Sequence, residues 1–251
     1  MAKIAIIGGS GLENPKILKN AGSVQLTTSF GDPSSDFKTG EISGVDVVIL
    51  SRHGRKHTIT PTGVNNRANI QAIKDLGCTH ILATTACGSL RKEIGRGDLV
   101  ILDQFIDFTR FRKNTFFESF ASGILNHIPM ADPFDSKMRQ ILTRTGEKLH
   151  LKYHPNGTVI TIEGPRFSTR VESHMFRQWG ADVINMSTAP ECMLANELGI
   201  PYAAIAMSTD YDCWKTGEDP VTWEAVIEVF KKNVANVINL LVESVPLLSG
   251  L

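Results

Sequence analysis

Two aspartates separated by one tyrosine follow an apolar run late in the chain. Residues 207–214 read MSTDYDCW and continue the run PYAAIA, which is typical of a buried strand. Because side chains alternate along a strand, Asp210 and Asp212 are expected to project from the same side if the extended backbone reaches that far. A second carboxylate nearby disfavours double ionisation and raises the pKa of its neighbour. The pair is therefore suited to donating a proton to a leaving group.

Other segments offer hydrogen-bond donors for a phosphate-sized anion, each near the end of an expected strand. The glycine turn GGSGL at 8–12 offers backbone N–H groups and the Ser10 hydroxyl. The segment SRHGRKH at 51–57 is the densest cationic cluster, ATTACGSL at 83–90 carries threonine hydroxyls, and Ser187 precedes an expected helix. Each segment alone has a structural interpretation as a tight turn, a solvated loop or close packing. Because ligands of α/β folds bind beyond the carboxyl ends of strands, together they favour an anion site.

Several common functional patterns are missing from the sequence. A dinucleotide fingerprint would need glycine where Asn14 stands, no Walker A lysine follows, and His53 and His57 do not form an H-E-x-x-H pair. The four cysteines are scattered without a C-x-x-C pair, which favours reduced thiols, no structural zinc and a cytoplasmic location. The 251 residues carry a formal net charge of +0, and no signal peptide or apolar membrane span is evident. A small-molecule partner is therefore favoured over nucleic acid or a membrane.

The order of elements predicts an α/β fold, because apolar strands alternate with helices. Strands are expected at 3–9, 45–52, 79–88, 97–107, 157–164, 181–187 and 201–210. Helices are expected at 64–76, 136–150, 171–179, 191–198 and 222–245. The irregular segment 109–134 is typical of a functional loop or a subunit contact.

Local signals place the helix ends. Asp135 is an expected N-cap and Gly77 an expected C-terminal stop. Capping boxes are expected for Thr169 with Glu172 and for Thr188 with Glu191, and Pro246 is expected to end the last helix.

Seven segments together resemble a known family. They read GGSGL, SRHGRKHTITP, TTACGSLRKEIGRGDLVILDQFID, HIPMADPF, EGPRFSTR, WGADVINMSTAPE and AMSTDYDCWK. In this order, from about residue 3 to about residue 230, they resemble the S-methyl-5′-thioadenosine phosphorylases of the purine nucleoside phosphorylase family. The resemblance implies one α/β domain over 1–251 around a twisted mixed β-sheet, in a homotrimer or a dimer of trimers. It implies phosphorolysis of S-methyl-5′-thioadenosine, and of adenosine as a further candidate, to adenine and 5-methylthioribose-1-phosphate or its counterpart.

The resemblance also implies roles for individual residues. The phosphate would contact Ser10, Arg52, His53, Thr85, the Ala86 backbone and Ser187. The nucleoside would contact Cys87, Gly88, Phe167, Met186, Asp210, Asp212 and, from across a subunit interface, His127. Asp210 would serve purine N7 and Asp212 the 6-amino group. Trp223, where smaller apolar residues are common in the family, is a candidate cover for the 5′ substituent because many close relatives have a longer C-terminal segment there.

Alternative functions differ in what the site must recognise. A 6-oxopurine or methylthioinosine phosphorylase would need a donor where Asp212 presents an acceptor. A nucleoside hydrolase would need no anion site, and a non-catalytic nucleotide-binding protein would be expected to have the full glycine pattern. A Mg²⁺ ion at the aspartate pair is a further alternative. The favoured hypothesis has no cofactor and no metal, with inorganic phosphate as co-substrate.

Overall fold

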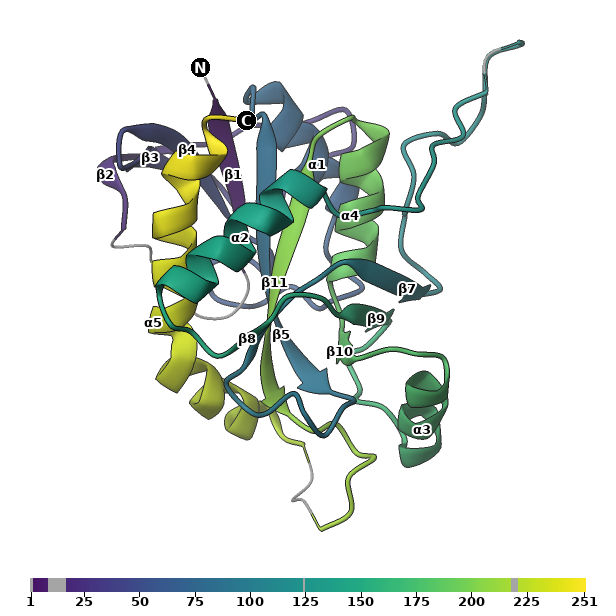
Figure 1. Ribbon diagram of the computed structural model, residues 1–251. Coiled ribbons are helices and arrows are strands. Elements are labelled where there is room, and N and C mark those ends of the chain that lie inside the picture. Colours follow the sequence, from purple (N-terminus) through teal and green to yellow (C-terminus); the bar gives the residue numbers. More distant parts are fainter. Residues whose placement is uncertain (1, 9–16, 124, 218–220) are drawn as a thin grey trace.

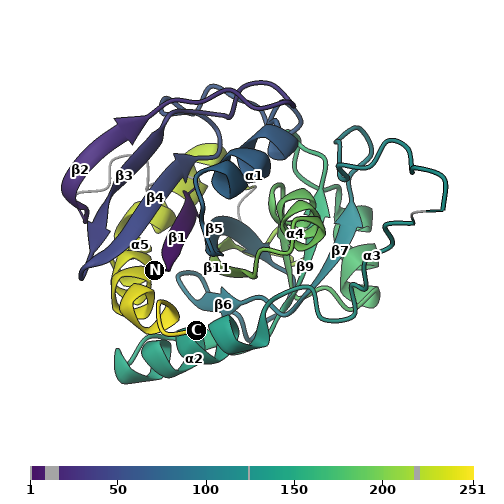
Figure 2. The same cartoon turned by 90° about the horizontal axis from the view of Figure 1, so that it is seen from above.

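The computed structural model describes residues 2–8, 17–123, 125–217 and 221–251. These residues form a large twisted mixed sheet with helices on both faces (Figures 1 and 2). The strands are β1 (Lys3–Gly8), β2 (Lys19–Val24), β3 (Phe37–Ile42), β4 (Val45–Ser51), β5 (His80–Ser89), β6 (Leu99–Ile101), β7 (Gln104–Phe108), β8 (Tyr153–His154), β9 (Thr158–Ile162), β10 (Val183–Asn185) and β11 (Tyr202–Asp210). The helices are α1 (Asn66–Asp75), α2 (Ser136–Lys148), α3 (Arg170–Gln178), α4 (Thr188–Glu197) and α5 (Trp223–Leu248).

The long strand β5 lies at the centre of the sheet. The main path of paired strands is β2-β3-β4-β1-β5-β10-β9-β7, while β11 pairs with β5 and β6, and β6 pairs with β8. Strands β1, β4, β5 and β11 are mutually parallel, so their carboxyl ends point the same way. Strand β10 is antiparallel to β5, with Ile184 opposite Gly88. The end of β10 therefore returns beside the second half of β5 instead of joining the other strand ends.

Alternating apolar side chains build a core on each face of the sheet. In β1, Ala5 and Ile7 belong to the buried cluster that includes residues of α1 and α4. Ile4 and Ile6 belong to the cluster that includes residues of α2 and α5. Figure 2 shows these two helix pairs on opposite sides of the strands. A strand that is buried on both faces is apolar throughout, which is why β1, β4, β5 and β11 were evident in the sequence.

Most expected helix ends are confirmed. The Asp135 carboxylate accepts a hydrogen bond from the Met138 N–H at 2.8 Å and caps α2. The capping box of Thr169 and Glu172 is present at the start of α3. Gly77 follows the C-cap of α1 with φ +73°, a left-handed conformation that suits glycine.

The expected capping box of Thr188 and Glu191 is wrong. Ser187 is the N-cap of α4 and makes no capping hydrogen bond through its side chain, while Glu191 is fully buried and paired with Arg52. A buried guanidinium is a much stronger partner for a carboxylate than a helix N-cap backbone. The expected N-cap, Thr188, is therefore one residue too late. Glu191 is a buried partner of Arg52 instead of a capping residue.

Three other expectations about the elements also need correction. The strand expected at 97–107 is two strands, because β6 pairs with β11 and β8 whereas β7 pairs with β9. Pro246 lies inside the last turn of α5, where its missing N–H removes only one bond and the buried Val245 and Leu248 hold the turn on the sheet. The strands β2 and β3 were missed because KNAGSV and FKTGEI have few apolar residues.

The irregular segment 109–134 has no helix or strand among its described residues and extends away from the sheet in Figure 1. Glu197 of α4 holds its base by accepting hydrogen bonds from the Thr115 hydroxyl at 2.6 Å and the Phe116 N–H at 2.7 Å. Phe111 and Leu125 expose 79% and 71% of their surface on this segment. Exposed apolar side chains on a projecting loop are typical of an interaction surface.

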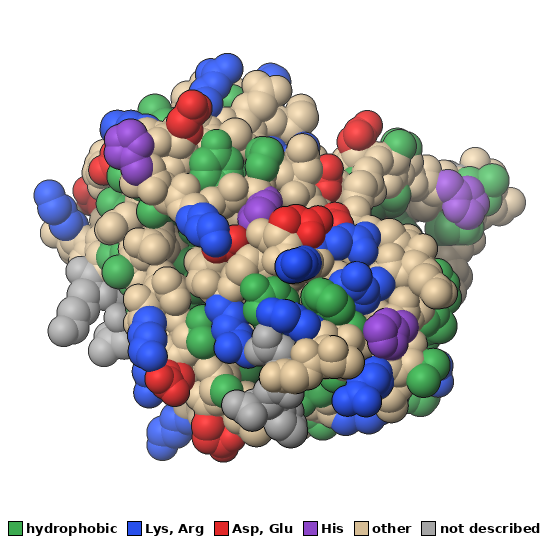
Figure 3. Space-filling view, turned by 60° about the horizontal axis from the view of Figure 1, so that its bottom comes forward, with side chains coloured by type: hydrophobic (Ala, Val, Ile, Leu, Met, Phe, Trp, Pro, Cys, Tyr) green, Lys and Arg blue, Asp and Glu red, His purple; other side chains and the backbone are tan. Residues whose placement is uncertain are grey.

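Figure 3 shows the face that lies at the bottom of Figure 1. Lys and Arg side chains are distributed across it, with hydrophobic and acidic side chains between them. Among the described residues, every helix is too short or too polar to span a bilayer.

Candidate active site

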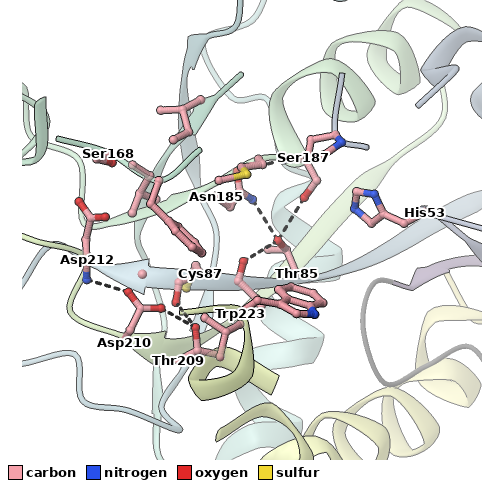
Figure 4. Close-up of a pocket in the computed structure, with 18 of the residues that line it drawn as sticks. His53, Thr85, Cys87, Ser168, Asn185, Ser187, Thr209, Asp210, Asp212 and Trp223 are labelled. Carbon is pink, nitrogen blue, oxygen red and sulfur yellow. Dashed lines mark hydrogen bonds between the residues drawn. The ribbon is translucent and has the colours of Figure 1, made fainter. Parts of the chain in front are cut away.

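A pocket of about 800 Å³, including its open mouth, lies where β4, β5 and β11 end and β10 folds back onto β5. Its lining residues are Arg52, His53, His57, Pro61, Thr85, Ala86, Cys87, Gly88, Ile162, Phe167, Ser168, Ile184, Asn185, Met186, Ser187, Thr209, Asp210, Asp212, Trp223 and Val226. Figure 4 shows two chemically different ends. Asp210 and Asp212 lie at one, and Thr85, Ser187 and His53 lie at the other.

Hydroxyl and amide groups form the neutral part of the second end. The Thr85 Oγ1 lies 3.1 Å from the Ser187 Oγ and accepts a hydrogen bond from the Asn185 amide at 3.2 Å. All three side chains are at most 7% exposed. Ser187 also stands at the N-terminus of α4, where the helix dipole favours an anion. Asn185 thus orients the Thr85 hydroxyl, and the hydroxyls of Thr85 and Ser187 can rotate to donate to a bound tetrahedral oxyanion.

Arg52 supplies a guanidinium group that stays protonated at this end. It follows β4 directly and is only 2% exposed. Burial lowers its pKa, but the ion pair with Glu191 more than offsets this and raises the pKa above its ordinary value. His53 and His57 of the cationic segment also line the pocket, whereas Arg55 turns away from it to pair with Asp36 at 3.0 Å. Lys56 is exposed and also absent from the pocket lining.

His53 lies at the same end of the pocket as Thr85 and Ser187, which we call the anion end, and its ring is neutral. Burial, together with the nearby Arg52 charge, lowers its pKa to about 4. The Nδ1 atom lies 2.9 Å from the Ile59 carbonyl oxygen, which only accepts, so Nδ1 carries the proton and Nε2 is an acceptor. His53 packs on His57 with ring centroids 4.6 Å apart, and His57 packs on Trp223 at 4.9 Å. The rings thus connect the anion end to the pocket wall at the start of α5.

The two aspartates meet, but not as neighbours on one strand face. Strand β11 ends at Asp210, and Asp212 has a left-handed backbone with φ +48°. The Asp212 N–H donates to the Asp210 carboxylate at 2.7 Å, and the Thr209 hydroxyl donates to its other oxygen at 2.8 Å (Figure 4). The extended backbone therefore does not reach Asp212, so the condition for a shared strand face is not met, although both carboxylates line the pocket.

The pKa of Asp210 is raised to about 6, mainly by burial. The charge of Asp212 contributes to the rise, but less than burial and less than the opposing hydrogen bonds from Thr209 and Asp212. Burial also raises the pKa of Asp212. The sequence therefore predicted the direction correctly but named a minor cause. A carboxyl with a pKa near 6 can hold a proton for transfer close to neutral pH.

This raised pKa predicts a pH-dependent stability gain for Asp210→Asn. The folded-state pKa of about 6 lies above the ordinary 3.8, so the group stabilises the fold below pH 3.8 and loses that contribution as the pH rises through 6. An amide does not ionise, so the variant should gain about 2–3 kcal/mol in free energy of unfolding relative to wild type across this window. Urea unfolding at several pH values measures the difference. A difference in the free energy of unfolding that does not change with pH would contradict the raised pKa of Asp210.

Gly88 is required by the close approach of β5 to the acidic end. A Cβ on Gly88 would lie 2.8 Å from an Asp210 carboxylate oxygen and 3.1 Å from the Ile184 Cγ2. The 2.8 Å contact is too short for a carbon atom, so the Asp210 carboxylate must move, and the 3.1 Å contact requires Ile184 to give slightly. Gly88→Ala is expected to lower kcat/KM about tenfold by displacing the carboxyl.

Gly250→Ala is the matched control, because its added Cβ meets only the Leu247 carbonyl at 3.6 Å. Steady-state kinetics on both variants test the prediction. An unchanged kcat/KM in Gly88→Ala would show that the Asp210 position is not critical.

The expected contacts for a flat apolar ligand are also in the pocket. Cys87 is a buried lining residue, and Met186, which precedes Ser187 in the sequence, also lines the pocket. Phe167 and Trp223 line it with 39% and 45% of their surface exposed. Burial and the nearby Asp210 raise the pKa of Cys87, so this residue is a small apolar group rather than a nucleophile.

One expected site residue is absent from the lining of this pocket, and another cannot be placed. Ser10 lies outside the described residues. His127 is exposed on the projecting segment 109–134, where it packs edge-on against Phe120 with centroids 5.4 Å apart. The structure thus brings together all other expected site residues.

Two residues that hold the pocket residues in place, Asn185 and Arg112, were not predicted from the sequence. Asn185 accepts from the Thr161 hydroxyl at 2.8 Å and donates to Thr85, and its place at the end of a predicted strand was an available signal. Arg112, with a side chain 2% exposed, donates to the Met186 carbonyl at 2.6 Å and to the Glu163 carbonyl at 2.6 Å. It lies in a segment without periodicity, so the sequence held no comparable signal for it.

The family profile described as "Phosphorylase superfamily" matches residues 3–246. The chain belongs to the phosphorylase superfamily. A relative named S-methyl-5′-thioadenosine phosphorylase from Xenopus tropicalis is 53% identical, over 99% of this chain and 90% of its own. One of the same name from Danio rerio is also 53% identical, over 97% and 88%.

Solved structures of this superfamily agree with the fold. Methylthioadenosine phosphorylase from Schistosoma mansoni in complex with adenine superposes with a TM-score of 0.95 at 44% identity, covering 100% of this chain and 93% of that one. A mutant of the adenosine/methylthioadenosine phosphorylase from the same organism, in complex with methylthioadenosine, gives a TM-score of 0.91 at 43% identity, covering 99% and 92%. The twisted mixed sheet with flanking helices is thus the phosphorylase fold that the sequence motifs indicated.

Proposed function

We propose that this chain catalyses the phosphorolysis of S-methyl-5′-thioadenosine to adenine and 5-methylthioribose-1-phosphate. The observation that carries the proposal is the pocket with an oxyanion site at one end and a carboxyl of raised pKa at the other. Relatives about half identical over nearly the full chain bear the name of this activity, which supports the same substrate class.

The proposed reaction breaks the bond between C1′ of the sugar and N9 of the purine. A phosphate oxygen forms the new bond to C1′, and the electron pair of the broken bond moves to the purine. Asp210 would give its proton to N7, so that the base leaves as neutral adenine. Phosphate is nucleophilic enough at neutral pH, and holding it beside C1′ supplies much of the rate. The proposed reaction uses no cofactor, and inorganic phosphate is the co-substrate.

Each end of the pocket would have a distinct recognition role. Arg52, Thr85, the Ala86 backbone and Ser187 would hold phosphate, with Ser10 as a further donor. The His53 Nε2 would accept a hydrogen bond from a protonated phosphate oxygen. The Asp212 carboxylate would accept a hydrogen bond from the 6-amino group, which an oxygen at that position cannot donate. Cys87, Gly88 and Phe167 would contact the base and Met186 the ribose, while Trp223 would cover the 5′ substituent.

Metal-assisted chemistry has no evident ligand set in the described ranges. Within residues 2–8, 17–123, 125–217 and 221–251, no three acidic, histidine or cysteine side chains gather as a metal site. We propose proton transfer from Asp210, whose carboxyl has a pKa raised to about 6, as the means of neutralising the leaving base.

A substrate panel tests the proposed function. Methylthioadenosine, adenosine, methylthioinosine and inosine are each incubated with and without phosphate, and the released base and sugar product are identified. The proposal requires adenine release from methylthioadenosine that depends on phosphate, and slow or no reaction of the 6-oxopurines. Release without phosphate would indicate a hydrolase, and no base release from any substrate would overturn the proposal.

We also propose that the active assembly is a homotrimer or a dimer of trimers in the cytoplasm. The exposed aromatic and aliphatic side chains on segment 109–134 support a subunit contact, and His127 on this segment would reach a neighbour's 5′ pocket. The free thiols Cys78, Cys87, Cys192 and Cys213 support a reducing compartment. Light scattering on the purified protein gives the number of chains.

A further inference from the structure

A buried carboxylate lies directly behind the proposed phosphate site. Glu191 is four residues after Ser187 along α4, so both side chains lie on the same side of that helix. The Glu191 carboxylate pairs with Arg52 through the Arg52 Nε and, at 3.0 Å, through the Arg52 Nη2. Glu191 is 0% exposed and Arg52 is 2% exposed. One helix therefore carries a pocket hydroxyl and the partner of the pocket's arginine.

The hydrogen bonds of Arg52 fix the plane of its guanidinium before any ligand binds. Arginine has five N–H donors. Glu191 takes one from Nε and one from Nη2, and the Thr84 carbonyl takes one from Nη1 at 2.9 Å. Among the partners that the described residues provide, one donor remains on each terminal nitrogen, and Arg52 lines the pocket. Two such donors suit two oxygens of one tetrahedral anion.

Tyr202 holds the carboxylate in turn. Its hydroxyl donates to the Glu191 Oε2 at 3.0 Å, and Tyr202 is 1% exposed on β11. Burial and the Glu191 charge raise the pKa of Tyr202 far above its ordinary value, so the hydroxyl remains a donor. The chain of contacts therefore runs from β11 through α4 to the residue that follows β4.

Stability alone does not explain this group. Replacing a buried ion pair by apolar residues of similar volume is often neutral or stabilising, because desolvation offsets the attraction. A fully buried Arg–Glu–Tyr set beside a pocket is better explained by the orientation that it gives to the arginine. Glu191 also largely balances the charge of Arg52. The orientation of the remaining N–H donors of Arg52 should therefore affect phosphate binding more than its net charge does.

We propose that Glu191 is a positioning residue for the phosphate site, acting through Arg52 and supported by Tyr202. The inference rests on the proposed phosphorolysis. It assigns the carboxylate no contact with phosphate or nucleoside. Replacing Glu191 is expected to weaken the binding of phosphate but not that of the nucleoside. This selectivity distinguishes a positioning role from a general role in folding.

Glu191→Gln is the direct test. A glutamine amide turns an N–H₂ group toward the Arg52 or Tyr202 donors, so at least one hydrogen bond is lost and the guanidinium rotates. The KM for phosphate is expected to rise about tenfold, while the KM for the nucleoside stays unchanged. Calorimetric titration with inorganic phosphate should show the same weakening without turnover. Charge alone predicts the opposite, since the freed Arg52 would attract phosphate more strongly, so a lower KM would overturn the proposal.

Tyr202→Phe is a milder variant that keeps the ion pair and the ring volume. It removes one donor to Glu191, so the KM for phosphate should rise about threefold. This variant keeps the test valid if Glu191→Gln does not fold. An unchanged phosphate KM in a folded Glu191→Gln would refute the positioning role, and if that variant does not fold, an unchanged phosphate KM in Tyr202→Phe would refute it.

A double variant separates positioning from a general structural effect. If Glu191 acts through Arg52, adding Glu191→Gln to Arg52→Met should not raise the phosphate KM further. An additive effect would contradict the proposal. Asp182→Asn is the matched control, because Asp182 pairs with Arg91 at 2.8 Å outside the pocket and its loss should leave both KM values unchanged.

The two proposals fail in different ways. Absence of phosphate-dependent base release by the wild-type protein would refute the proposed function, whereas calorimetry with phosphate would still test Glu191. Normal phosphorolysis with equal changes in both KM values for Glu191→Gln would refute the positioning role alone.

Discussion

Asp210→Ala should lower kcat for phosphorolysis by about 10²–10⁴-fold, the usual contribution of a general acid. The purine gains negative charge as the glycosidic bond breaks, and the variant has no group to donate a proton at N7. The KM for phosphate should change little, because Asp210 lies at the opposite end of the pocket from Thr85 and Ser187 (Figure 4). Stopped assays of adenine release at saturating phosphate measure the loss. A kcat within threefold of wild type would exclude Asp210 as the acid.

The pH profile gives a second test of the same role. The competent form of Asp210 is protonated, so kcat/KM of the wild type should fall as the pH rises above about 6. Asp210→Asn keeps a hydrogen-bond donor but cannot release a proton, so this fall should be absent. Phosphate also titrates, but equally for both proteins, so their activity ratio isolates Asp210. A ratio that is constant with pH would contradict the assignment.

The proposed acid and the proposed anion site lie at opposite ends of one pocket because of the sheet topology. Parallel strands bring Arg52 and Asp210 to the same edge, as the sequence predicted from strand ends. Asn185 and Ser187 reach this edge differently, since β10 runs antiparallel to β5 and returns along it. A site at a strand end could be predicted from the chain order, but the direction of β10 could not.

The apolar strands of the core were predictable because burial on both faces leaves a continuous hydrophobic run. The exposed edge strand β2 has no such run, and only its pairing with β3 shows it as a strand. The residues of the site likewise divide into those that could be predicted from the sequence and those that could not. Residue types suited to anions and proton transfer were visible in the sequence, whereas their supporting partners were not.

Glu191 illustrates why supporting residues escape sequence reasoning. Its position three residues after Thr188 matched a capping box, which depends only on local spacing. Its actual partners are Arg52 and Tyr202, which are 139 and 11 residues away in the chain. A competing long-range ion pair has no local sequence signal. The same holds for Arg112, which contacts two strand ends from an irregular segment.

The cause of the raised Asp210 pKa also required the structure. Adjacent acidic residues suggested like-charge repulsion, but Asp212 donates its backbone N–H to Asp210, which opposes the effect of its charge. Burial is the dominant cause. The charge of Asp212 therefore contributes less to the raised pKa of Asp210 than burial does.

Asp212→Asn should shift the preference of the enzyme from 6-aminopurine to 6-oxopurine nucleosides. A carboxylate accepts from a 6-amino group but meets O6 as a second acceptor, whereas the asparagine amide can donate to O6. The ratio of kcat/KM for methylthioadenosine to that for methylthioinosine should fall by about 100-fold or more, because unpaired buried polar groups discriminate strongly.

The local backbone makes Asp212→Asn a clean substitution. Asp212 has φ +48°, and asparagine tolerates this left-handed conformation as well as aspartate does. The backbone N–H that donates to Asp210 is kept, so the acid should remain in place. Asp36→Asn, which loses only an exposed pair with Arg55, is the control and should leave the ratio unchanged. If Asp212→Asn is folded, still releases adenine and has an unchanged ratio, Asp212 does not read position 6, and specificity must come from the shape of the pocket.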